Sequence, residues 1–482
     1  LMSRVLDAIA KHAADKPDAV ALSDDTGTWS FAELGIAVAE AARSLTDLCE
    51  DGRRPVAVKL PNSAAWVIID LALLSIGRVS VPLADFYSDD QVAAAMADSG
   101  AGWIIEPADD LPVLRVLGHA LSVRKLNTDD VSIHAGTAKI SYTSGSTSAP
   151  KGVCLSVALQ EQVAASIVER FGAGYAGIHV PVLSLGVLLE NVAGLYPVLL
   201  AGGHYKIVET GSLGLSNPFR PDFAAMRSAL AANNASSTIL VPELLRGLMS
   251  RPDIPVPDLR LVAVGGSKMA PGLVVAARAS GLPVYEGYGL TECGSVVAVN
   301  APAGDRPGTC GVPLSHANVS IAADGEVIVG GQMFLGYVGQ PAHEGAVHTG
   351  DLGEVDADGF LSIVGRKKNV IITSFGRNVS PEWVESELLL QREFAQAIVL
   401  GDGEARLSAL LVPSSVDVNG PAASAAVDRA NERLPAYARI GSFRLVPPLT
   451  PASGLVTANG RPRRDAIAQA FRSLIPEGET AT

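Results

Sequence analysis

The sequence predicts an α/β fold, with a large N-terminal domain of layered α/β subdomains and a small α+β domain at the C-terminal end. Up to about Gly365, helix-like periodic segments alternate with short β-branched runs, which is typical of largely parallel sheets. After that point the pattern changes, because a charged segment, GRKKN, precedes a new strand–helix–strand unit. The length of 482 residues also exceeds that of one ordinary domain.

The elements of the large domain follow a regular order. Residues 5–14 are predicted as a helix and residues 19–24 as a strand. A capping box formed by Ser30 and Glu33 opens a second helix, since the two side chains satisfy each other's backbone N–H groups. The alternation then continues with a helix at 66–77 and with strands at 56–60, 79–83, 102–107, 237–242, 259–266 and 282–289.

The boundary between the two predicted domains falls at a Lys-rich hinge. We place the N-terminal domain at residues 1–366, the hinge at 367–369 and the C-terminal domain at 370–482, because a charged segment ahead of a new folding unit marks a boundary. In the small domain, Pro381 suits the first turn of a helix. The stretch 416–426, rich in alanine, is predicted as a surface loop.

Charge and composition exclude several classes of function. The net charge of −13 and the pI near 5.1 disfavour a nucleic-acid partner, since phosphate neutralisation needs clustered Lys and Arg. The longest apolar stretch, residues 180–189, is about half of what a membrane span requires, and the first residues contain no apolar signal core. A cytoplasmic location is therefore expected. The four scattered cysteines form no metal-binding or disulfide pattern and are interpreted as packing residues.

The most informative segment is SYTSGSTSAPKG, residues 141–152. Backbone amides freed by glycine, several hydroxyls and one lysine are what a loop needs to wrap a triphosphate. The segment does not fit GxxxxGK[ST], so an ordinary P-loop is excluded. A flexible surface loop would explain glycine and serine but not the ordered placement of the threonines, the proline and Lys151.

This segment resembles the phosphate loop of the adenylate-forming superfamily, which includes acyl-CoA synthetases, firefly luciferase and the adenylation domains of nonribosomal peptide synthetases. It departs from YTSGSTGxPKG by Ser148 in place of a glycine. The resemblance implies an enzyme that uses ATP and Mg²⁺, with a β-barrel-like part in the large domain and a mobile small domain. It also implies that the β- and γ-phosphates of ATP are held by Thr143, Ser144, Gly145, Ser146, Thr147 and Lys151.

Further motifs occur in the order that this superfamily requires. The segment YEGYGLTE combines an aromatic face for a purine with a hydroxyl and a carboxylate, which suits a phosphate and a divalent cation. The resemblance implies Tyr288 against adenine, Thr291 on the α-phosphate and Glu292 on magnesium. Glycine-rich turns beside the nucleotide are expected at Gly265, Gly266 and Ser267, and at Gly287 and Gly289.

The sequence TGD, followed by a hairpin-like DADG turn and then GRKKN, continues the series. The resemblance implies that Asp351 takes the ribose hydroxyls and that Arg366 also contacts the nucleotide. The resemblance also implies that Lys368 takes the pivot position, about which the small domain would rotate between two half-reactions. The following loop, GRNVSPEWVE, would then enter the site for thioester formation.

The chain departs from the superfamily where a catalytic lysine is expected near the C-terminal end. The aligned residue is Arg461, and no lysine follows Lys368. Arginine keeps the charge but is longer and planar, so the exchange is not conservative. Three interpretations are open: Arg461 acts in place of the lysine, the enzyme is slow in adenylation but competent in thioester transfer, or the lysine was replaced so that one state is held.

The sequence gives less direct information about the substrate and the acceptor. The segment 181–203 is rich in leucine and valine and is expected to line part of the acid pocket, which favours a hydrophobic or fatty acid. Aryl acids remain an alternative. Glu190 is a candidate for holding an ammonium group, although a structural role for it is favoured. Coenzyme A is the expected acceptor, with a phosphopantetheine carrier protein as the main alternative. Rival functions are an adenylate-binding homologue with impaired adenylation and a relative that uses the acyl adenylate without a thiol.

Overall fold

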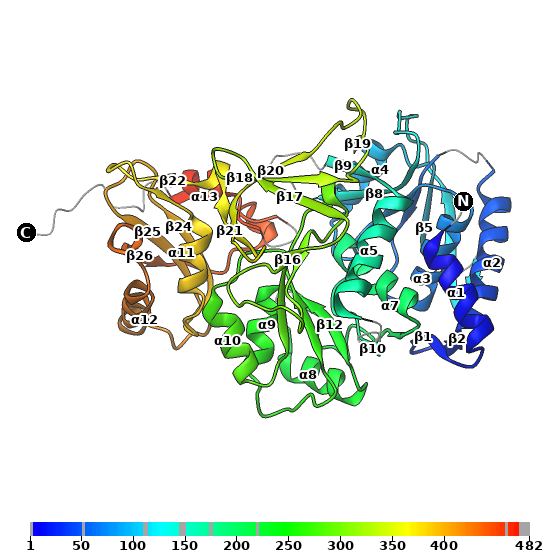
Figure 1. Ribbon diagram of the computed structural model, residues 1–482, viewed down its shortest axis with the longest axis horizontal. Helices are drawn as coiled ribbons and strands as arrows, with labels where there is room; N and C mark the ends of the chain where they lie inside the picture. The colour runs from blue at the N-terminus through cyan, green and yellow to red at the C-terminus, as the bar shows by residue number, and fades with distance from the viewer. Residues whose placement is uncertain are drawn as a thin grey trace, which may run out of the picture.

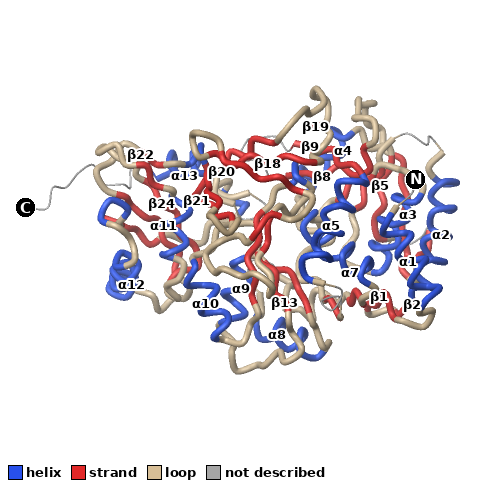
Figure 2. The backbone as a smooth tube through the Cα atoms, in the orientation of Figure 1, coloured by secondary structure: helices blue, strands red, loops and turns tan. Residues whose placement is uncertain are grey.

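A computed structural model describes residues 3–50, 54–108, 114–143, 151–172, 177–217, 221–457 and 461–471. Two large mixed sheets form the body, and a small domain lies at the opposite end from the N-terminal helices (Figure 1). Figure 2 shows that helices cover and separate the sheets. Among the described residues, no helix is long and apolar enough to cross a membrane.

The first large sheet contains nine strands of the described chain. Their spatial order is β16 (Val312–Pro313), β15 (Ala298–Val299), β14 (Val284–Tyr288), β13 (Leu261–Val264), β12 (Ser237–Leu240), β10 (Ile178–His179), β11 (His204–Lys206), β1 (Val20–Asp24) and β2 (Gly27–Ser30). The pairs from β1 through β14 are parallel, and antiparallel strands close both edges. Parallel strands end at a common edge, and this edge is where a ligand is expected.

The second large sheet contains eight described strands. Their order is β19 (Gly336–Tyr337), β9 (Lys151–Ser156), β8 (Thr137–Thr143), β4 (Ser80–Pro82), β3 (Val56–Val58), β5 (Trp103–Pro107), β7 (His119–Lys125) and β6 (Leu114–Val116). β3, β4, β5 and β8 are joined in parallel. β8 and β9 form an antiparallel pair on either side of the predicted phosphate loop.

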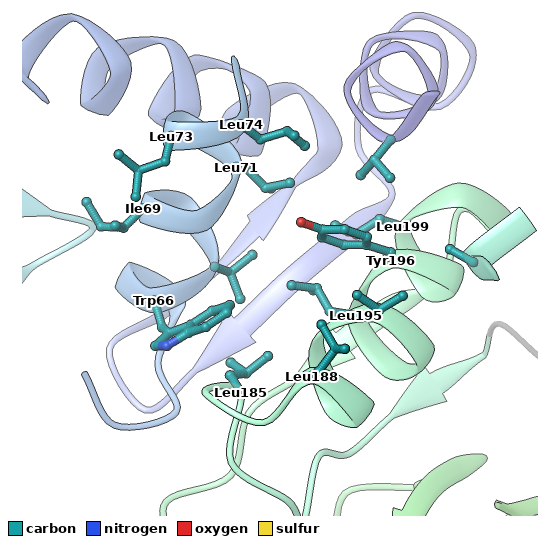
Figure 3. Packing of buried hydrophobic residues seen from close by; sticks show 14 of the residues in the cluster. Trp66, Ile69, Leu71, Leu73, Leu74, Leu185, Leu188, Leu195, Tyr196 and Leu199 are labelled. Atoms are coloured by element: carbon teal, nitrogen blue, oxygen red, sulfur yellow. The ribbon is translucent and has the colours of Figure 1, made fainter. Parts of the chain in front are cut away.

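A layer of helices lies between the two sheets. It consists of α1 (Arg4–Asp15), α2 (Phe31–Leu48), α3 (Ala64–Ser75), α5 (Val157–Phe171), α6 (Leu188–Glu190), a π-helical turn η2 (Asn191–Leu195) and α7 (Tyr196–Ala201). Ser30 and Glu33 form the predicted capping box of α2. α3 is buried on all sides, as a helix between two sheets must be. Figure 3 shows Trp66 and Leu71 of α3 facing Leu195 and Tyr196.

The outer faces of both sheets carry their own helices. α8 (Phe223–Ala232), α9 (Pro242–Met249) and α10 (Pro271–Ala279) pack on the first sheet and form a separate apolar cluster with β12, β13 and β14. α4 (Asp89–Ser99) packs on the second sheet. The result is an α–β–α–β–α stack, which confirms the predicted layered α/β body.

A four-stranded antiparallel sheet connects this body to the C-terminal part. Its strands are β17 (Ala317–Ile321), β18 (Glu326–Gly331), β20 (Val347–Val355) and β21 (Leu361–Arg366). The predicted DADG turn joins β20 to β21 as a hairpin. The resemblance implies a barrel-like part in the large domain, whereas the described strands pair as an open sheet in the order β17–β18–β20–β21.

The C-terminal part has its own small core. The short helix η4 (Lys367–Asn369) leads to β22 (Ile371–Ile372), β23 (Asn378–Val379), α11 (Pro381–Leu388), β24 (Phe394–Leu400), β25 (Leu407–Pro413), α12 (Gly420–Glu432), β26 (Ile440–Leu445) and α13 (Arg464–Phe471). Two 3₁₀ turns of this part lie at Ala436–Ala438 (η5) and Pro451–Ser453 (η6), and a third, η3 (Thr291–Cys293), lies in the large domain. Pro381 begins α11, as predicted. The small domain is therefore α+β.

One prediction about this domain is wrong. The stretch 416–426 was expected to be a surface loop, but α12 begins at Gly420. Asn419 caps the helix by accepting a hydrogen bond from the backbone N–H of Ala422, and alanines fill the interior. Because alanine has the highest helix propensity, an Ala-rich stretch after an Asn–Gly–Pro start indicates a helix.

The four cysteines are all buried, and none of them forms a disulfide bond within the described chain. Cys49, Cys293 and Cys154 belong to apolar clusters of the large domain. Burial raises the pKa of the Cys154, Cys293 and Cys310 thiols, so these side chains remain protonated. Their packing role agrees with the sequence-based interpretation.

Candidate active site

Two glycine turns lie at the carboxyl ends of neighbouring parallel strands. Gly265 and Gly266 follow β13, and Gly289 follows β14. Gly266 has a φ of +94°, which favours glycine. At Gly289, a Cβ atom would lie 1.7 Å from the carbonyl oxygen of Ser295, so only glycine fits. These turns place exposed backbone at the edge of the sheet where a nucleotide is expected.

Asp351, Arg366 and Tyr288 form one hydrogen-bonded cluster. Asp351 and Arg366 are register partners in the β20–β21 hairpin. Arg366 Nε donates to Asp351 Oδ1 over 2.7 Å and Nη2 donates to Oδ2 over 3.2 Å. The hydroxyl of Tyr288 donates to the same Oδ2 over 2.8 Å. Burial and then the charge of Asp351 raise the pKa of Tyr288, so the phenol stays a donor.

Glu292 lies in a second cluster with Tyr337, a residue that the sequence analysis did not single out. The hydroxyl of Tyr337 donates to Glu292 Oε1 over 2.8 Å. The Lys151 Nζ atom lies 5.3 Å from the centre of the Tyr337 ring, a cation–π distance. Tyr337 ends β19, which pairs with β9 directly beyond Lys151. A Gly–Tyr dipeptide has no spacing that would have identified it from sequence.

Arg461 reaches this region from the C-terminal segment. Its Nη2 atom lies 3.4 Å from the carbonyl oxygen of Gly266. The pKa of Arg461 is lowered, first by desolvation of the guanidinium and then by repulsion from Arg366, whereas Asp351 and Glu292 act in the opposite direction. Although the residue is exposed, its charged end lies among the motif residues of the large domain.

The predicted hinge residue, Lys368, lies between two anchored neighbours. Lys367 Nζ donates to Asp324 over 2.6 Å and to Glu326 over 3.3 Å, both in the four-stranded sheet region. Asn369 Nδ2 donates to Glu382 of α11 over 2.6 Å. The chain is therefore attached to the large body on one side of Lys368 and to the small domain on the other.

A buried carboxyl lies beneath the glycine turns. Glu286 of β14 is 6% exposed, and within the described chain its Oε2 atom has no hydrogen-bond partner. Burial raises its pKa to about 8, although the charge of Lys268 partly opposes the shift. Lys268 Nζ donates to the carbonyl oxygens of Ile363 and Val364, over 2.6 and 3.1 Å. This lysine thus ties the glycine turn to β21 ahead of Arg366.

Some of the remaining predicted site residues lie in the described chain, and others lie outside it. Thr143 ends β8 opposite Lys151, while Ser144, Gly145, Ser146 and Thr147 lie outside the described residues. Ser267 is exposed at the glycine turn, Gly287 lies in β14, and Thr291 begins the short helix η3. The motifs are thus brought to one region, with the phosphate loop known only at its two ends.

The segment predicted to line the acid pocket is mostly core. Within 181–203, the side chains of Leu185, Leu188, Leu195 and Leu199 pack into the central helical layer (Figure 3). Glu190 is fully buried. Its Oε1 atom accepts a hydrogen bond from Tyr205 over 2.9 Å and lies 3.0 Å from His179 Nε2. These contacts agree with the structural role favoured for Glu190.

The charged groups of the site fit a magnesium nucleotide. Lys151, Arg366 and Arg461 supply positive charge, and Glu292 and Asp351 supply carboxylates in the same region. Mg²⁺ usually binds through one or two carboxylates together with substrate phosphates and waters. No group of three or more potential metal-ligating side chains occurs in the described parts of the chain. The carboxylate of Glu292 fits Mg²⁺ held mainly by phosphate.

Comparison with known families agrees with this geometry. A family model described as AMP-binding enzyme matches residues 9–338, and one described as AMP-binding enzyme C-terminal domain matches residues 368–478. This chain belongs to the AMP-binding enzymes. The resemblance to adenylate-forming enzymes is therefore confirmed, and so is the prediction that the chain is an enzyme.

Relatives of this AMP-binding enzyme cover nearly its whole length. The long-chain-fatty-acid–CoA ligase FadD15 of Mycobacterium bovis is 27% identical, over 97% of this chain and 95% of that protein. The o-succinylbenzoate CoA synthetase MenE from Bacillus subtilis, in complex with an acyl-adenylate, has a TM-score of 0.78 at 23% identity and covers 97% of this chain and 98% of its own. The anthranilate CoA ligase AuaEII, with anthranoyl-AMP, has a TM-score of 0.82 at 17% identity over 98% of each chain. At these levels of identity, the two solved structures show only that the fold is shared.

Proposed function

We propose that this AMP-binding enzyme joins a carboxylic acid to AMP and then transfers the acyl group to the thiol of coenzyme A. The observation that supports the proposal most strongly is the contact of Arg461 with the glycine turn of the large domain, in which Nη2 lies 3.4 Å from the carbonyl oxygen of Gly266. A cation from the small domain thereby lies beside Asp351, Arg366 and Glu292. This arrangement suits the formation of an adenylate, in which negative charge builds at the α-phosphate.

In the first half-reaction a carboxylate oxygen of the acid attacks the α-phosphorus of ATP, and the bond to pyrophosphate breaks. We assign Arg461 and Thr291 to the α-phosphate and Lys151 to the outer phosphates, together with Thr143, Ser144, Gly145, Ser146 and Thr147. Glu292 would hold Mg²⁺, which when bound neutralises phosphate charge. Tyr337 supports this role, because its hydrogen bond orients the Glu292 carboxylate.

The nucleoside end would be held at the other cluster. Tyr288 would face the adenine, with the backbone of Gly265, Gly266, Ser267, Gly287 and Gly289 lining its edge. Asp351 would accept the ribose hydroxyls. Three donor contacts already use its oxygens, and a carboxylate accepts about four hydrogen bonds. Binding of two ribose hydroxyls therefore requires at least one of these three contacts to be released, and we propose that Tyr288 is the residue that releases Asp351.

In the second half-reaction the thiol sulfur attacks the acyl carbon and AMP leaves. We propose that residues 370–482 rotate about Lys368 between the two steps. The anchors on either side support this, since Lys367 is held by Asp324 and Glu326 and Asn369 is held by Glu382. Rotation confined to one residue would leave both sets of bonds intact, as in a hinge motion.

A hydrophobic acid is proposed as the substrate. FadD15, a long-chain-fatty-acid–CoA ligase, matches 97% of this chain. The apolar segment 181–203 gives weaker support than its composition implied, because much of it packs in the core. Coenzyme A as acceptor is favoured by the names of the curated relatives, which include a feruloyl-CoA synthase and several succinylbenzoate–CoA ligases.

The test is Mg²⁺-dependent pyrophosphate release from ATP across acids from acetate to palmitate and benzoate, with and without coenzyme A, followed by product mass. Release with an acyl-CoA product is expected for at least one hydrophobic acid. Glu292→Gln is the control for background release, since glutamine still accepts the Tyr337 hydrogen bond but lacks the charge. Acyl transfer only to a phosphopantetheine carrier protein would contradict the acceptor assignment.

A second candidate is an adenylate-binding homologue with impaired adenylation, and the arginine at position 461 is the observation that favours it. In that case ATP or AMP would bind, pyrophosphate release would stay at the level of Glu292→Gln, and a supplied acyl-adenylate would still react with coenzyme A. The same assay therefore separates the two candidates.

A further inference from the structure

We propose that an ion pair between Arg464 and Glu385 positions Arg461 for the adenylation step. This inference rests on the proposed function. Arg464 begins α13, three residues after Arg461, and Glu385 lies in α11. The hydrogen-bond partners of Arg464 in the described chain are Glu385, Glu382 and the carbonyl oxygen of Val399, all in the small domain, so it acts through Arg461 as a positioning residue.

The pair has the geometry of a rigid attachment. Arg464 Nη1 donates to Glu385 Oε1 over 2.8 Å, and Nη2 donates to Oε2 over 2.7 Å. The two side chains are only 18% and 10% exposed. The backbone N–H of Val399 also donates to Glu385 Oε1, over 2.8 Å. A bidentate, partly buried pair with a further backbone bond fixes both distance and orientation.

The connection from Arg464 to Arg461 is short and hydrogen-bonded. The backbone N–H of Thr457 donates to the carbonyl oxygen of Arg461 over 2.8 Å, and the N–H of Arg461 donates to the Thr457 hydroxyl over 3.1 Å. Val456 and Pro462 form an antiparallel bridge. The N–H of Arg463 donates to Leu455. Hydrogen bonds thus tie Arg461 to Thr457 on one side, and Arg464 fixes the chain three residues beyond Arg461 on the other.

The same network reaches the hinge. Arg464 Nη2 lies 3.4 Å from Glu382 Oε1, and Asn369 donates to that same oxygen over 2.6 Å. Glu382 therefore joins the start of α13 to the residue that follows Lys368. Through these contacts, the small domain presents Arg461 in a defined place relative to the axis about which it would rotate.

The expected consequence is specific to one half-reaction. Only adenylation needs Arg461 at the glycine turn, so loss of the pair should slow pyrophosphate exchange and spare transfer from a supplied acyl-adenylate to coenzyme A. A displacement of about 1 Å at a reacting centre costs roughly 100-fold in rate. We therefore expect Arg464→Gln to lower adenylation by about 10- to 100-fold, with kcat changing more than the KM for ATP.

Two further variants serve as a conservative substitution and as a control for this experiment. Arg464→Lys keeps the charge but makes only single hydrogen bonds, so it should recover part of the adenylation rate. Arg429→Gln is the matched control, because Arg429 forms another Arg–Glu pair of the small domain, with Glu393 over 2.7 Å. It should leave both half-reactions at the wild-type level.

Equal loss of both half-reactions in Arg464→Gln would overturn the positioning role, and so would an unchanged adenylation rate. A wild-type enzyme with no adenylation activity would contradict the proposed function instead. Hydrogen–deuterium exchange tests the inference even in an enzyme without adenylation activity. Peptides spanning 455–471 should exchange faster in Arg464→Gln than in the wild type, whereas the exchange rate of peptides spanning 394–413 should not change. Unchanged exchange at 455–471 would overturn the inference without reference to catalysis.

Discussion

Among single residues, Arg461 is central to the proposed chemistry. Its guanidinium contacts the Gly266 carbonyl and lies near one cation and two carboxylates. These surroundings suit a planar cation with several donors better than an ammonium group. They favour the interpretation in which arginine acts in place of the usual lysine.

The corresponding prediction concerns two substitutions at position 461. Arg461→Gln should lower ATP–pyrophosphate exchange by about 100-fold, since it removes the positive charge aimed at the reacting phosphate. The exchange rate of Arg461→Lys should also be lower than that of the wild type, because a shorter side chain loses the Gly266 contact. Stopped assays of labelled pyrophosphate exchange measure both. A faster Arg461→Lys enzyme would show that the native arginine is a compromise.

The buried carboxyl of Glu286 predicts a pH dependence of stability. Its pKa is about 8 in the folded protein against an ordinary 4.5. Between these values the folded state binds more protons than the unfolded chain, so the free energy of unfolding falls as pH rises. This contribution is fully present below pH 4.5 and is lost as pH rises through 8.

Glu286→Gln should therefore gain stability over the wild type progressively from pH 5 to pH 8, as measured by urea unfolding at each pH. Glu354→Gln is the control, since Glu354 is exposed and its removal should give no such trend. Parallel profiles for Glu286→Gln and the wild type would rule out titration of this group.

At the level of elements, β8 is held by a buried polar cluster before it reaches the phosphate loop. Lys139 Nζ lies 2.9 Å from Asp70 Oδ1 of α3. The Tyr196 hydroxyl and Asn191 Nδ2 donate to Asp70 Oδ2, over 2.8 and 3.1 Å. Lys139 also donates to Asn191. The cluster joins β8, α3 and the π-helical turn in the middle of the apolar layer.

Breaking this cluster should be costly. Lys139→Met leaves the Asp70 charge buried without its cationic partner, and loss of one member of a buried pair costs about 3–5 kcal/mol. We expect a fall of about 3 kcal/mol in the free energy of unfolding by urea denaturation. Lys125→Met, at an exposed position, should change it by less than about 1 kcal/mol. A similar small change for both would show that the cluster contributes little.

The elements also show what could be predicted from local patterns. The capping box of α2 and the Pro381 start of α11 were predictable because caps act within three residues. Composition alone does not predict the helix α12, because an Ala-rich stretch indicates a helix only together with its Asn419 cap. The core role of 185–199 was also missed, because an apolar segment looks the same whether it lines a pocket or packs against α3.

For the whole molecule, the main prediction concerns movement at the hinge. Lys368→Pro fixes φ at this position and should lower acyl transfer to coenzyme A while retaining adenylate formation, because only the second step requires rotation. Single-turnover assays of each half-reaction measure the difference. Lys367→Ala, which removes the bonds to Asp324 and Glu326, is a matched control for damage beside the hinge. Retained transfer in Lys368→Pro would place the pivot elsewhere.

The site as a whole was predictable to the extent that its motifs are contiguous. Asp351, Arg366 and Glu292 could be proposed from the sequence because short segments carry them in a known order, and their roles stay predictions. Tyr337 was not, since it acts across two sheet strands far apart in the sequence. Arg464 and Glu385 were not assigned either, because their pairing over 79 positions depends on how the small domain folds. Such contacts between distant segments require the three-dimensional structure.

The burial of every cysteine has a practical consequence for testing the proposed rotation. Cys49, Cys154, Cys293 and Cys310 are enclosed in packed regions, so thiol-reactive dyes should leave the native enzyme unlabelled. A cysteine introduced at Ile36, on α2, and another at Val416, in the small domain, would both be accessible, since these positions are 60% and 101% exposed. A donor–acceptor dye pair attached there would report the separation of the two domains without prior removal of any natural thiol.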